Sequence, residues 1–232
     1  MNYWAIVPAA GIGSRMGSAC PKQYLSLQGK TVLQHTLERL ARLPLAGIVV
    51  CLAAHDSYWA TLTLDLAVPI IEVPGGAERC HSVLNGLQAL TSRANSNDWV
   101  LVHDAARPCV RVADMQKLMR ELVEHPVGGL LAIPVRDTMK RASGNRVDET
   151  VNRKDLWHAL TPQMFRLGAL TQALQLALTQ GETVTDDAQA MERQGIYPIL
   201  VEGHADNIKI THPQDLYLAD LFLTQQLSKN VA

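Results

Sequence analysis

VPAAGIGSRMGSACPKQYLSLQGKTVLQHTLERL, residues 7–40, joins a short apolar run to an amphipathic helical pattern through a long glycine-rich stretch. A strand, a loop and a helix in this order form the repeating unit of α/β folds. About two dozen residues separate the two patterns here, whereas such connections usually take about 2–6 residues. The loop also carries Arg15 and Lys22. We therefore expect a ligand-binding loop after the first strand; a glycine-rich turn without a ligand is the plainer alternative.

Two well-known phosphate-binding patterns do not fit this loop. A dinucleotide fingerprint requires G-x-G-x-x-G, and although Gly11 and Gly13 match, Met16 stands where the third glycine belongs. A P-loop requires G-x-x-x-x-G-K-[ST], and residues 29–31 supply its end, but Tyr24 stands at the first glycine. The loop is therefore expected to hold its ligand in another way.

Composition excludes several functional classes. The 232 residues suit one α/β domain, and a net charge of −1 gives no field that would attract nucleic acid or an anionic membrane. No apolar run approaches the roughly 18 residues of a transmembrane helix, and no signal segment precedes the first strand. The four cysteines form no C-x-x-C pair, which is typical of a reducing cytosol. We expect a cytoplasmic protein without nucleic-acid or membrane partners.

Short apolar runs alternate with helical patterns along the chain. The runs that indicate buried strands are residues 4–7, 47–52, 70–73, 99–103, 129–133 and 197–201. The helical patterns cover residues 31–43, 81–90, 113–124, 170–179 and 186–194, with a last helix that starts near 211. This alternation predicts an α/β, Rossmann-like fold, in which a mostly parallel sheet carries helices on both faces. The whole chain, 1–232, is expected to form a single domain.

One charged segment, residues 134–160, interrupts this alternation. Its sequence, PVRDTMKRASGNRVDETVNRKDLWHAL, is too long for a simple connection in a compact domain. DTMKRA and ETVNR flank the turn residues SGN, which predicts a β-hairpin. An exposed hairpin arm needs a surface to pack against, and a second subunit would supply it.

Polar residues recur just after the expected strands. They are Lys22, Gly75, Gly76, Asp104, Arg107, Arg136, Asp137, Thr138, Lys140, Asp206 and Lys209. Because ligands of open α/β sheets lie beyond the carboxyl ends of the strands, we expect these residues to surround one site. Several cations beside acids such as Asp104 and Asp206 suit a polyphosphate with a divalent cation. The structural alternative is that Asp104 caps the turn that follows it and pairs with Arg107.

Seven motifs carry a family resemblance. They are PAAGIGSRMG with PKQYL, GGAERCHS, VHDAARP, PVRDTMKR, LTPQMF, VTDDAQAME and VEGHADNIKIT. In this order they resemble the 2-C-methyl-D-erythritol 4-phosphate cytidylyltransferases over nearly the whole chain. The resemblance implies transfer of the cytidylyl group of CTP to 2-C-methyl-D-erythritol 4-phosphate, which gives 4-diphosphocytidyl-2-C-methyl-D-erythritol and pyrophosphate. It also implies a need for Mg²⁺ or a similar ion, and a homodimer built through the arm at 134–160.

The resemblance assigns roles to individual residues. The family's transition-state arginine and lysine fall on Arg15 and Lys22, and Arg153 and Lys209 complete the implied catalytic set. Nucleotide binding is implied for Ala9, Ala10, Gly11, Gly13, Gly75, Gly76, Arg79, Ser82, Asp104 and Ala105. Sugar-phosphate binding is implied for Thr138, Arg153, Thr161, Thr185 and Lys209. The implied metal ligands are Asp104 and Asp206.

Two other functions remain open at this point. A ribitol 5-phosphate cytidylyltransferase would share the fold and the first loop but use another acceptor. A non-catalytic nucleotide-binding module would have little need for both Arg15 and Lys22 beside the reacting phosphorus. One departure from the family is Ala77, where an acidic residue is frequent, and this departure affects a polar contact near the base rather than the reaction.

Overall fold

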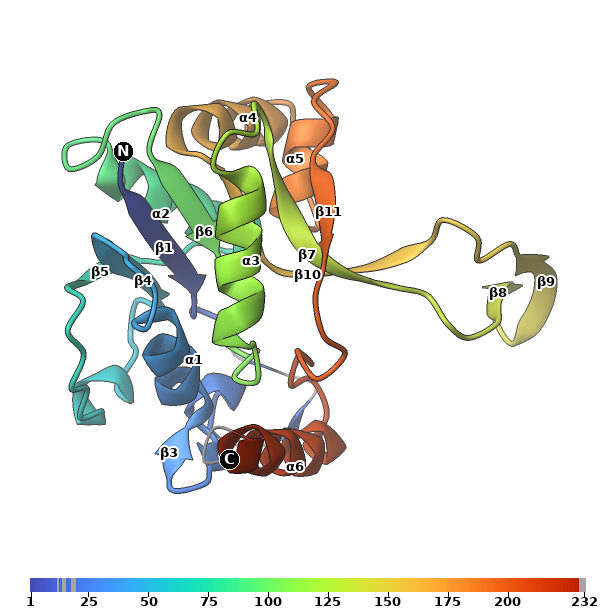
Figure 1. Cartoon of the computed structure of the whole chain (residues 1–232), viewed down its shortest axis with the longest axis horizontal. Coiled ribbons are helices and arrows are strands. Elements are labelled where there is room, and N and C mark those ends of the chain that lie inside the picture. Colours follow the sequence, from blue (N-terminus) through green and yellow to red (C-terminus); the bar gives the residue numbers. More distant parts are fainter. Residues whose placement is uncertain (12, 14–15, 18–19, 230–232) are drawn as a thin grey trace.

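A seven-stranded sheet forms the centre of the molecule (Figure 1). The computed structural model describes residues 1–11, 13, 16–17 and 20–229. In spatial order the strands are β11 (Ile199–Glu202), β7 (Gly128–Pro134), β10 (Trp157–Arg166), β6 (Trp99–Val102), β1 (Tyr3–Pro8), β4 (Gly47–Leu52) and β5 (Ile70–Pro74). Only β10 pairs with its neighbours in the antiparallel sense among these strands. The predicted α/β class with a mostly parallel sheet is confirmed.

Strand β10 was not expected from the sequence. It begins at Trp157, inside the segment 134–160 that was assigned to the arm, and it lies between β6 and β7 in the middle of the sheet. Its pairing with β7 is interrupted between Ala159 and Gln163. Pro162, whose peptide bond to Thr161 is cis, lies in this gap, where a missing N–H breaks no ladder. The strand brings Thr161 to the edge at which β6 ends.

The two faces of the sheet carry separate apolar clusters, because successive strand side chains point to opposite faces. Ala5 and Val7 of β1 belong to one cluster, and Trp4 and Ile6 belong to the other. The helices are α1 (Val32–Leu40), α2 (Arg79–Leu90), α3 (Val112–Leu122), α4 (Leu167–Thr179), α5 (Asp187–Glu192) and α6 (Pro213–Lys229). Helices α1 and α3 contribute to the first cluster, and α2, α4 and α5 to the second. Within the described part, no helix is long and apolar enough to cross a membrane.

Helix α6 crosses the end of the molecule at which the first loop lies (Figure 1). Its Ala219 and Leu223 pack in a third apolar cluster with Leu27, Val32 and Ile210. Leu27 belongs to the short strand pair β2 (Ser26–Leu27) and β3 (Lys30–Thr31), which closes the first loop. This cluster therefore brings the first loop close to the segment that precedes α6.

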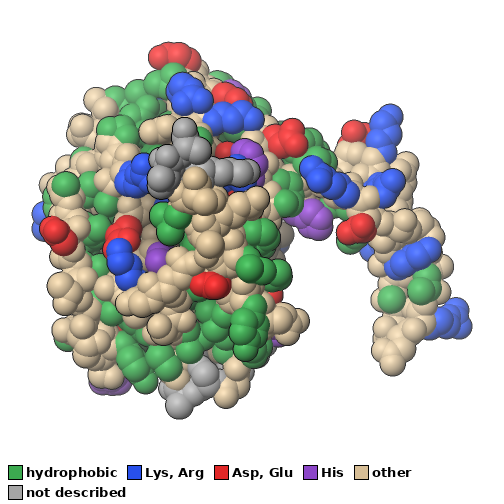
Figure 2. Space-filling model, turned by 60° about the horizontal axis from the view of Figure 1, so that its bottom comes forward, with side chains coloured by type: hydrophobic (Ala, Val, Ile, Leu, Met, Phe, Trp, Pro, Cys, Tyr) green, Lys and Arg blue, Asp and Glu red, His purple; other side chains and the backbone are tan. Residues whose placement is uncertain are grey.

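The arm is a β-hairpin that stands clear of the sheet (Figures 1 and 2). Strands β8 (Met139–Ser143) and β9 (Arg146–Val151) pair in the antiparallel sense, as predicted. Nearly every arm side chain is exposed, including Val147 at 55%. The arm is therefore not packed against the body of its own chain, and its pairing with a second subunit stays a prediction.

Candidate active site

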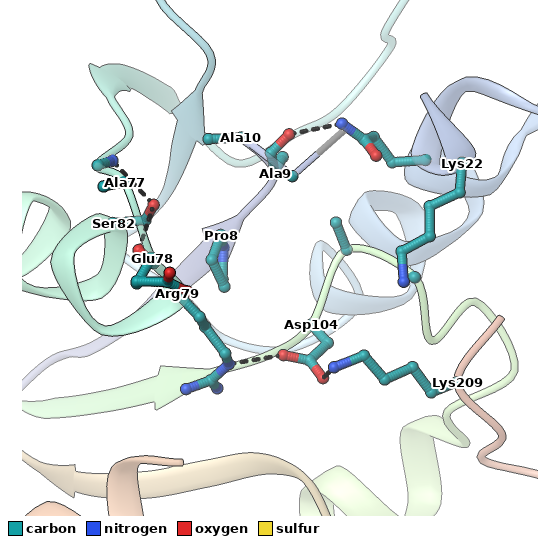
Figure 3. A pocket seen from close by; sticks show the side chains of 15 residues that line it. Pro8, Ala9, Ala10, Lys22, Ala77, Glu78, Arg79, Ser82, Asp104 and Lys209 are labelled. Carbon is teal, nitrogen blue, oxygen red and sulfur yellow. Dashed lines mark hydrogen bonds and ion pairs between the residues drawn. The ribbon is translucent and has the colours of Figure 1, made fainter. Parts of the chain in front are cut away.

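A pocket of about 230 Å³ opens at the edge where β1, β5 and β6 end (Figure 3). It is lined by Pro8, Ala9, Ala10, Gly11, Lys22, Gln23, Gly76, Ala77, Glu78, Arg79, Ser82, Asp104, Ala105, Ala106 and Lys209. The loops meet here because parallel strands present their carboxyl ends at one edge. Eight of the ten residues predicted to bind the nucleotide line this pocket; the other two, Gly13 and Gly75, lie against the lining residues Lys22 and Ala10.

The first loop continues the line of β1 into the pocket. The amide of Ala9 donates to the carbonyl of Cys51 at 2.9 Å, and the buried side chain of Gln23 donates to the carbonyl of Ala9 at 2.6 Å. The sequence analysis missed Gln23, because a neutral side chain that holds a backbone carries no charge signal. These two contacts fix the small residues that line the pocket.

Lys22 reaches the pocket from a short 3-10 helix, Lys22–Tyr24. Its ammonium group donates to the carbonyl of Ile210 at 3.0 Å. Gly13 has a φ of +67°, and a β-carbon added there would lie 3.0 Å from the Cγ atom of Lys22. Glycine at this position therefore leaves room for the lysine to cross the loop. The predicted partner of Lys22 in catalysis, Arg15, lies outside the described residues.

A second loop closes the opposite wall between β5 and α2. The hydroxyl of Ser82 accepts from the amide of Gly76 at 3.0 Å and donates to the carbonyl of Glu78 at 3.3 Å. A β-carbon added to Gly75 would lie 2.3 Å from the β-carbon of Ala10 and 3.2 Å from the carbonyl oxygen of Leu52. The two loops therefore touch at Gly75 without space for any side chain.

We expect Gly75→Ala to lower the free energy of unfolding by about 1–3 kcal/mol and to weaken nucleotide binding, because overpacking must push the loops apart. Gly11→Ala is the matched control for stability, since a β-carbon there meets nothing within 4 Å. Denaturant unfolding of both variants measures the first effect, and nucleotide titration of Gly75→Ala against the wild type measures the second. Equal stability of the two variants would contradict this account of Gly75.

Asp104 lies at the centre of a cluster of cations (Figure 3). One carboxylate oxygen accepts from Nε of Arg79 at 2.9 Å, and the other lies 2.8 Å from Nζ of Lys209 and 3.6 Å from Nε of Arg107. Burial alone would raise the pKa of Asp104, but the three cations outweigh burial and hold that pKa well below its usual range. Asp104 therefore stays ionised and fixes the directions of Arg79 and Lys209.

Arg79 is held from its other side by Asp187. The two terminal nitrogens of the guanidinium donate to the two carboxylate oxygens of Asp187 at 3.2 and 2.8 Å. Asp187 is fully buried in the first turn of α5, and Asp186 caps that helix by accepting from the amide of Gln189 at 2.9 Å. Burial alone would lower the pKa of Arg79, but the two carboxylates raise it. The sequence analysis missed Asp187, although the motif VTDD contains it.

A second cavity of about 210 Å³ adjoins the first. It is lined by Arg79, Asp104, Arg107, Ala159, Leu160, Thr161, Gln163, Thr185, Asp186 and Lys209. Three residues predicted to bind the acceptor, Thr161, Thr185 and Lys209, meet here. Arg79, Asp104 and Lys209 line both cavities, so the same charged groups face a ligand in either one.

The buried His103 contacts Arg107 and Thr161, two residues that line the second cavity. Nε2 of His103 lies 3.1 Å from the carbonyl of Arg107, so Nε2 carries the proton, because a carbonyl only accepts. Nδ1 then accepts from the hydroxyl of Thr161 at 3.0 Å, while that hydroxyl accepts from the amide of Asp104 at 3.1 Å. Burial lowers the pKa of His103 to about 4, so the ring is neutral at physiological pH.

The protein should therefore lose stability as pH falls from about 6.5 towards 4. In that window the unfolded chain protonates His103 and the folded chain does not, so the loss between pH 6.5 and 5 is about 2 kcal/mol. Denaturant unfolding at the two pH values, compared between the wild type and His103→Gln, measures it. The exposed His55→Gln is the control and should keep the wild-type slope. An unchanged slope in His103→Gln would contradict this assignment.

Three other predicted residues lie elsewhere. Thr138 and Arg153 are exposed on the arm, and among the residues that the structure describes they line neither cavity. Arg153 donates to the carbonyl of Arg136. Asp206 accepts from Arg111 at 2.7 Å and from Gln226 at 2.8 Å and lines a different cavity. The structure thus does not bring Asp206 and Asp104, the two predicted metal ligands, into one pocket. Over residues 1–11, 13, 16–17 and 20–229, no group of three His, Cys, Asp or Glu could hold a metal ion.

Cations grouped over two adjoining cavities at the carboxyl edge of an α/β sheet are typical of enzymes that move a nucleotidyl group between phosphates. The family model of IspD, 2-C-methyl-D-erythritol 4-phosphate cytidylyltransferase, matches residues 3–225. The chain belongs to this family and is a nucleotidyltransferase.

Named relatives and solved structures agree with this membership. The chain is 51% identical over 222 residues to the 2-C-methyl-D-erythritol 4-phosphate cytidylyltransferase of Vibrio atlanticus, with 95% of each protein covered. It is 54% identical over 217 residues to that of Pseudomonas aeruginosa, with 92% of this chain and 93% of the relative covered. The crystal structure of the Francisella tularensis enzyme aligns with a TM-score of 0.84 and 37% identity, over 96% of this chain and all of that one.

Proposed function

We propose that the protein transfers the cytidylyl group of CTP to 2-C-methyl-D-erythritol 4-phosphate, with release of pyrophosphate. The observation that carries this proposal is the pair of adjoining cavities that share Arg79, Asp104 and Lys209. CTP would occupy the larger cavity, against the first loop and Lys22. The acceptor phosphate would occupy the smaller one, beside Thr161 and Lys209.

In this arrangement a phosphate oxygen of the acceptor attacks the α-phosphorus of CTP in line. A new phosphorus–oxygen bond forms, and the bond from the α-phosphorus to the pyrophosphate oxygen breaks. No covalent enzyme intermediate is needed, so the protein contributes positioning and charge stabilisation. Lys22 would face the charge that grows on the leaving pyrophosphate, and Lys209 would orient the acceptor phosphate.

The pyrophosphate released from each of CTP, UTP, ATP and GTP, with each of two acceptors, tests the proposal. We expect rapid release only with CTP and 2-C-methyl-D-erythritol 4-phosphate. Faster release with ribitol 5-phosphate would replace this proposal by the alternative cytidylyltransferase. No release with any pair, in a protein that still binds CTP, would favour the non-catalytic module.

Mg²⁺ is proposed to arrive with the triphosphate rather than on protein carboxylates. Asp104 does not fit a direct metal ligand, because both of its oxygens already face cations. We expect turnover to stop in excess EDTA, and the Mg²⁺ concentration that gives half-maximal rate to be unchanged in Asp206→Asn. Asp104→Asn should lower the rate without raising that concentration. A clear rise in either variant would restore the carboxylate as a metal ligand.

We propose further that the enzyme works in the cytoplasm as a homodimer built through the arm. The state of the cysteines supports the cytoplasmic location, and the exposure of the arm supports the dimer. Cys51, Cys80 and Cys109 are free thiols, and the arm at 134–160 presents exposed side chains that nothing in its own chain covers among the described residues.

A further inference from the structure

A third cavity, of about 360 Å³, lies between α1, α3 and α6. Its walls are formed by Arg39, Arg42, Arg111, Val112, Ala113, Gln116, Gln225 and Gln226, and we call it the arginine cavity. None of these residues lines the two cavities assigned to the reaction. Its volume exceeds that of the pocket proposed for CTP, so it has room for a small ligand of its own.

The residues that line the arginine cavity carry more positive than negative charge. Three arginines line it, and among the lining residues that the structure describes there is no Asp or Glu. Asp206 lies behind the wall and accepts only from Arg111 among the three, at 2.7 Å. Burial lowers the pKa of Arg39, and the charges of Arg42 and Arg111 add to that lowering, while Cys109 and Asp206 oppose it in part. Arginines that crowd one another in this way favour an anion between them.

Neutral groups of the wall add hydrogen-bonding capacity. The amides of Val112 and Ala113 belong to the first turn of α3, where a helix of 11 residues has no side-chain cap. Gln226 is 8% exposed, and its amide nitrogen donates to the carbonyl of Cys109 and to Asp206. Its Oε1 atom has no hydrogen-bond partner in the described structure. Because an amide oxygen only accepts, this atom suits a donor such as water, and the donors available to an anion are the guanidinium groups and the two backbone amides.

We propose that the arginine cavity binds a small phosphorylated anion, about the size of pyrophosphate, at a site separate from the catalytic pocket. Planar guanidinium groups match phosphate oxygens in pairs, which is why three arginines indicate phosphate rather than a single carboxylate. The bound anion competes with Asp206 for Arg111. Asn207, the next residue, donates to the carbonyl of Thr161 and accepts from Arg107, so occupancy is transmitted to the reacting groups.

Equilibrium dialysis of the full chain with labelled inorganic pyrophosphate, in EDTA and low salt, tests the proposal. Saturating CTP fills the catalytic pocket, and one pyrophosphate per chain should remain bound. The double variant Arg39→Gln/Arg42→Gln should weaken this binding at least tenfold. The control Arg93→Gln/Arg120→Gln removes the same charge from exposed positions and should bind like the wild type. Circular dichroism and thermal unfolding confirm that both double variants fold.

Asp206→Asn supplies a test with the opposite sign. Without the competing carboxylate, Arg111 is available to the ligand, and pyrophosphate should bind several-fold more tightly. Complete displacement of pyrophosphate by CTP, or an equal loss in both double variants, would overturn the proposal. A decrease in the number of pyrophosphate molecules bound per chain as the protein concentration rises would also overturn it. In that case a second copy of the chain would fill the cavity.

Discussion

Lys22→Ala should lower kcat by about 10²–10³-fold, which corresponds to roughly 3–4 kcal/mol of transition-state stabilisation. The ammonium group lies on the wall of the larger cavity, where the triphosphate of CTP is proposed to bind, and it is held there by the carbonyl of Ile210. Charge grows on the leaving pyrophosphate as its bond breaks, and a cation already in place stabilises that charge without rearrangement. Steady-state rates of pyrophosphate release measure the loss.

The control for this variant is Lys30→Ala. Lys30 lies near the same loop but pairs with Glu38 on the surface, and its side chain is 48% exposed, so its removal should leave kcat unchanged. Thermal unfolding shows whether each variant is folded. A folded Lys22→Ala enzyme with near-normal kcat would remove Lys22 from the mechanism. Arg15→Ala should behave like Lys22→Ala, and the two losses should not simply add.

Mixing two inactive variants should restore about a quarter of wild-type activity. Neither cavity is lined by Arg153 among the described residues of its own chain, and we propose that Arg153 acts from the arm of a partner subunit. In a mixed dimer of Lys22→Ala and Arg153→Ala, one site carries both defects. The other site combines an intact Lys22 with an intact Arg153. Random exchange makes about half of the dimers mixed, each with one good site of two.

Co-expression with two different tags establishes that mixed dimers form. Arg146→Ala is the matched arm control, since Arg146 is also exposed on β9 and has no implied role. It should remain active by itself. If mixed dimers stay as inactive as either parent variant, Arg153 does not act from the arm of the partner subunit. The assignment of cytidylyltransferase activity would be unaffected by that result.

The sequence predicted most of the sheet because its parallel strands are continuous apolar runs. It failed at β10, since WHALTPQMFR contains a proline and directly follows a charged segment. A proline argues against a central strand unless the ladder is interrupted, and such an interruption between Ala159 and Gln163 cannot be read from one sequence. The pattern therefore predicted the right class of fold but missed the strand that completes the sheet.

Site residues that come directly after a strand could be predicted from the sequence. Residues that orient another side chain, such as Asp187, could not. Asp104 was expected at the pocket because loops at the carboxyl edge converge, whereas Ser82 was implied only by the family resemblance, and both line the pocket. Asp187 was missed because its pairing with Arg79 spans 108 residues of sequence. The family resemblance implied Asp206 and Asp104 as joint metal ligands, and this role stays a prediction. In the structure Arg111 draws Asp206 towards another cavity.

The place of β10 in the sheet sets an order of events during synthesis. Strand β7 has only β10 and β11 as neighbours, so it has no sheet partner when it first leaves the ribosome. Strands β1, β4, β5 and β6 can pair as soon as residue 102 has emerged, but their edge at β6 stays open until residue 166 is made. An open edge can pair with another chain. Nascent chains stalled between these two points should therefore aggregate more readily than chains released after residue 202, when β11 has also covered the outer edge of β7.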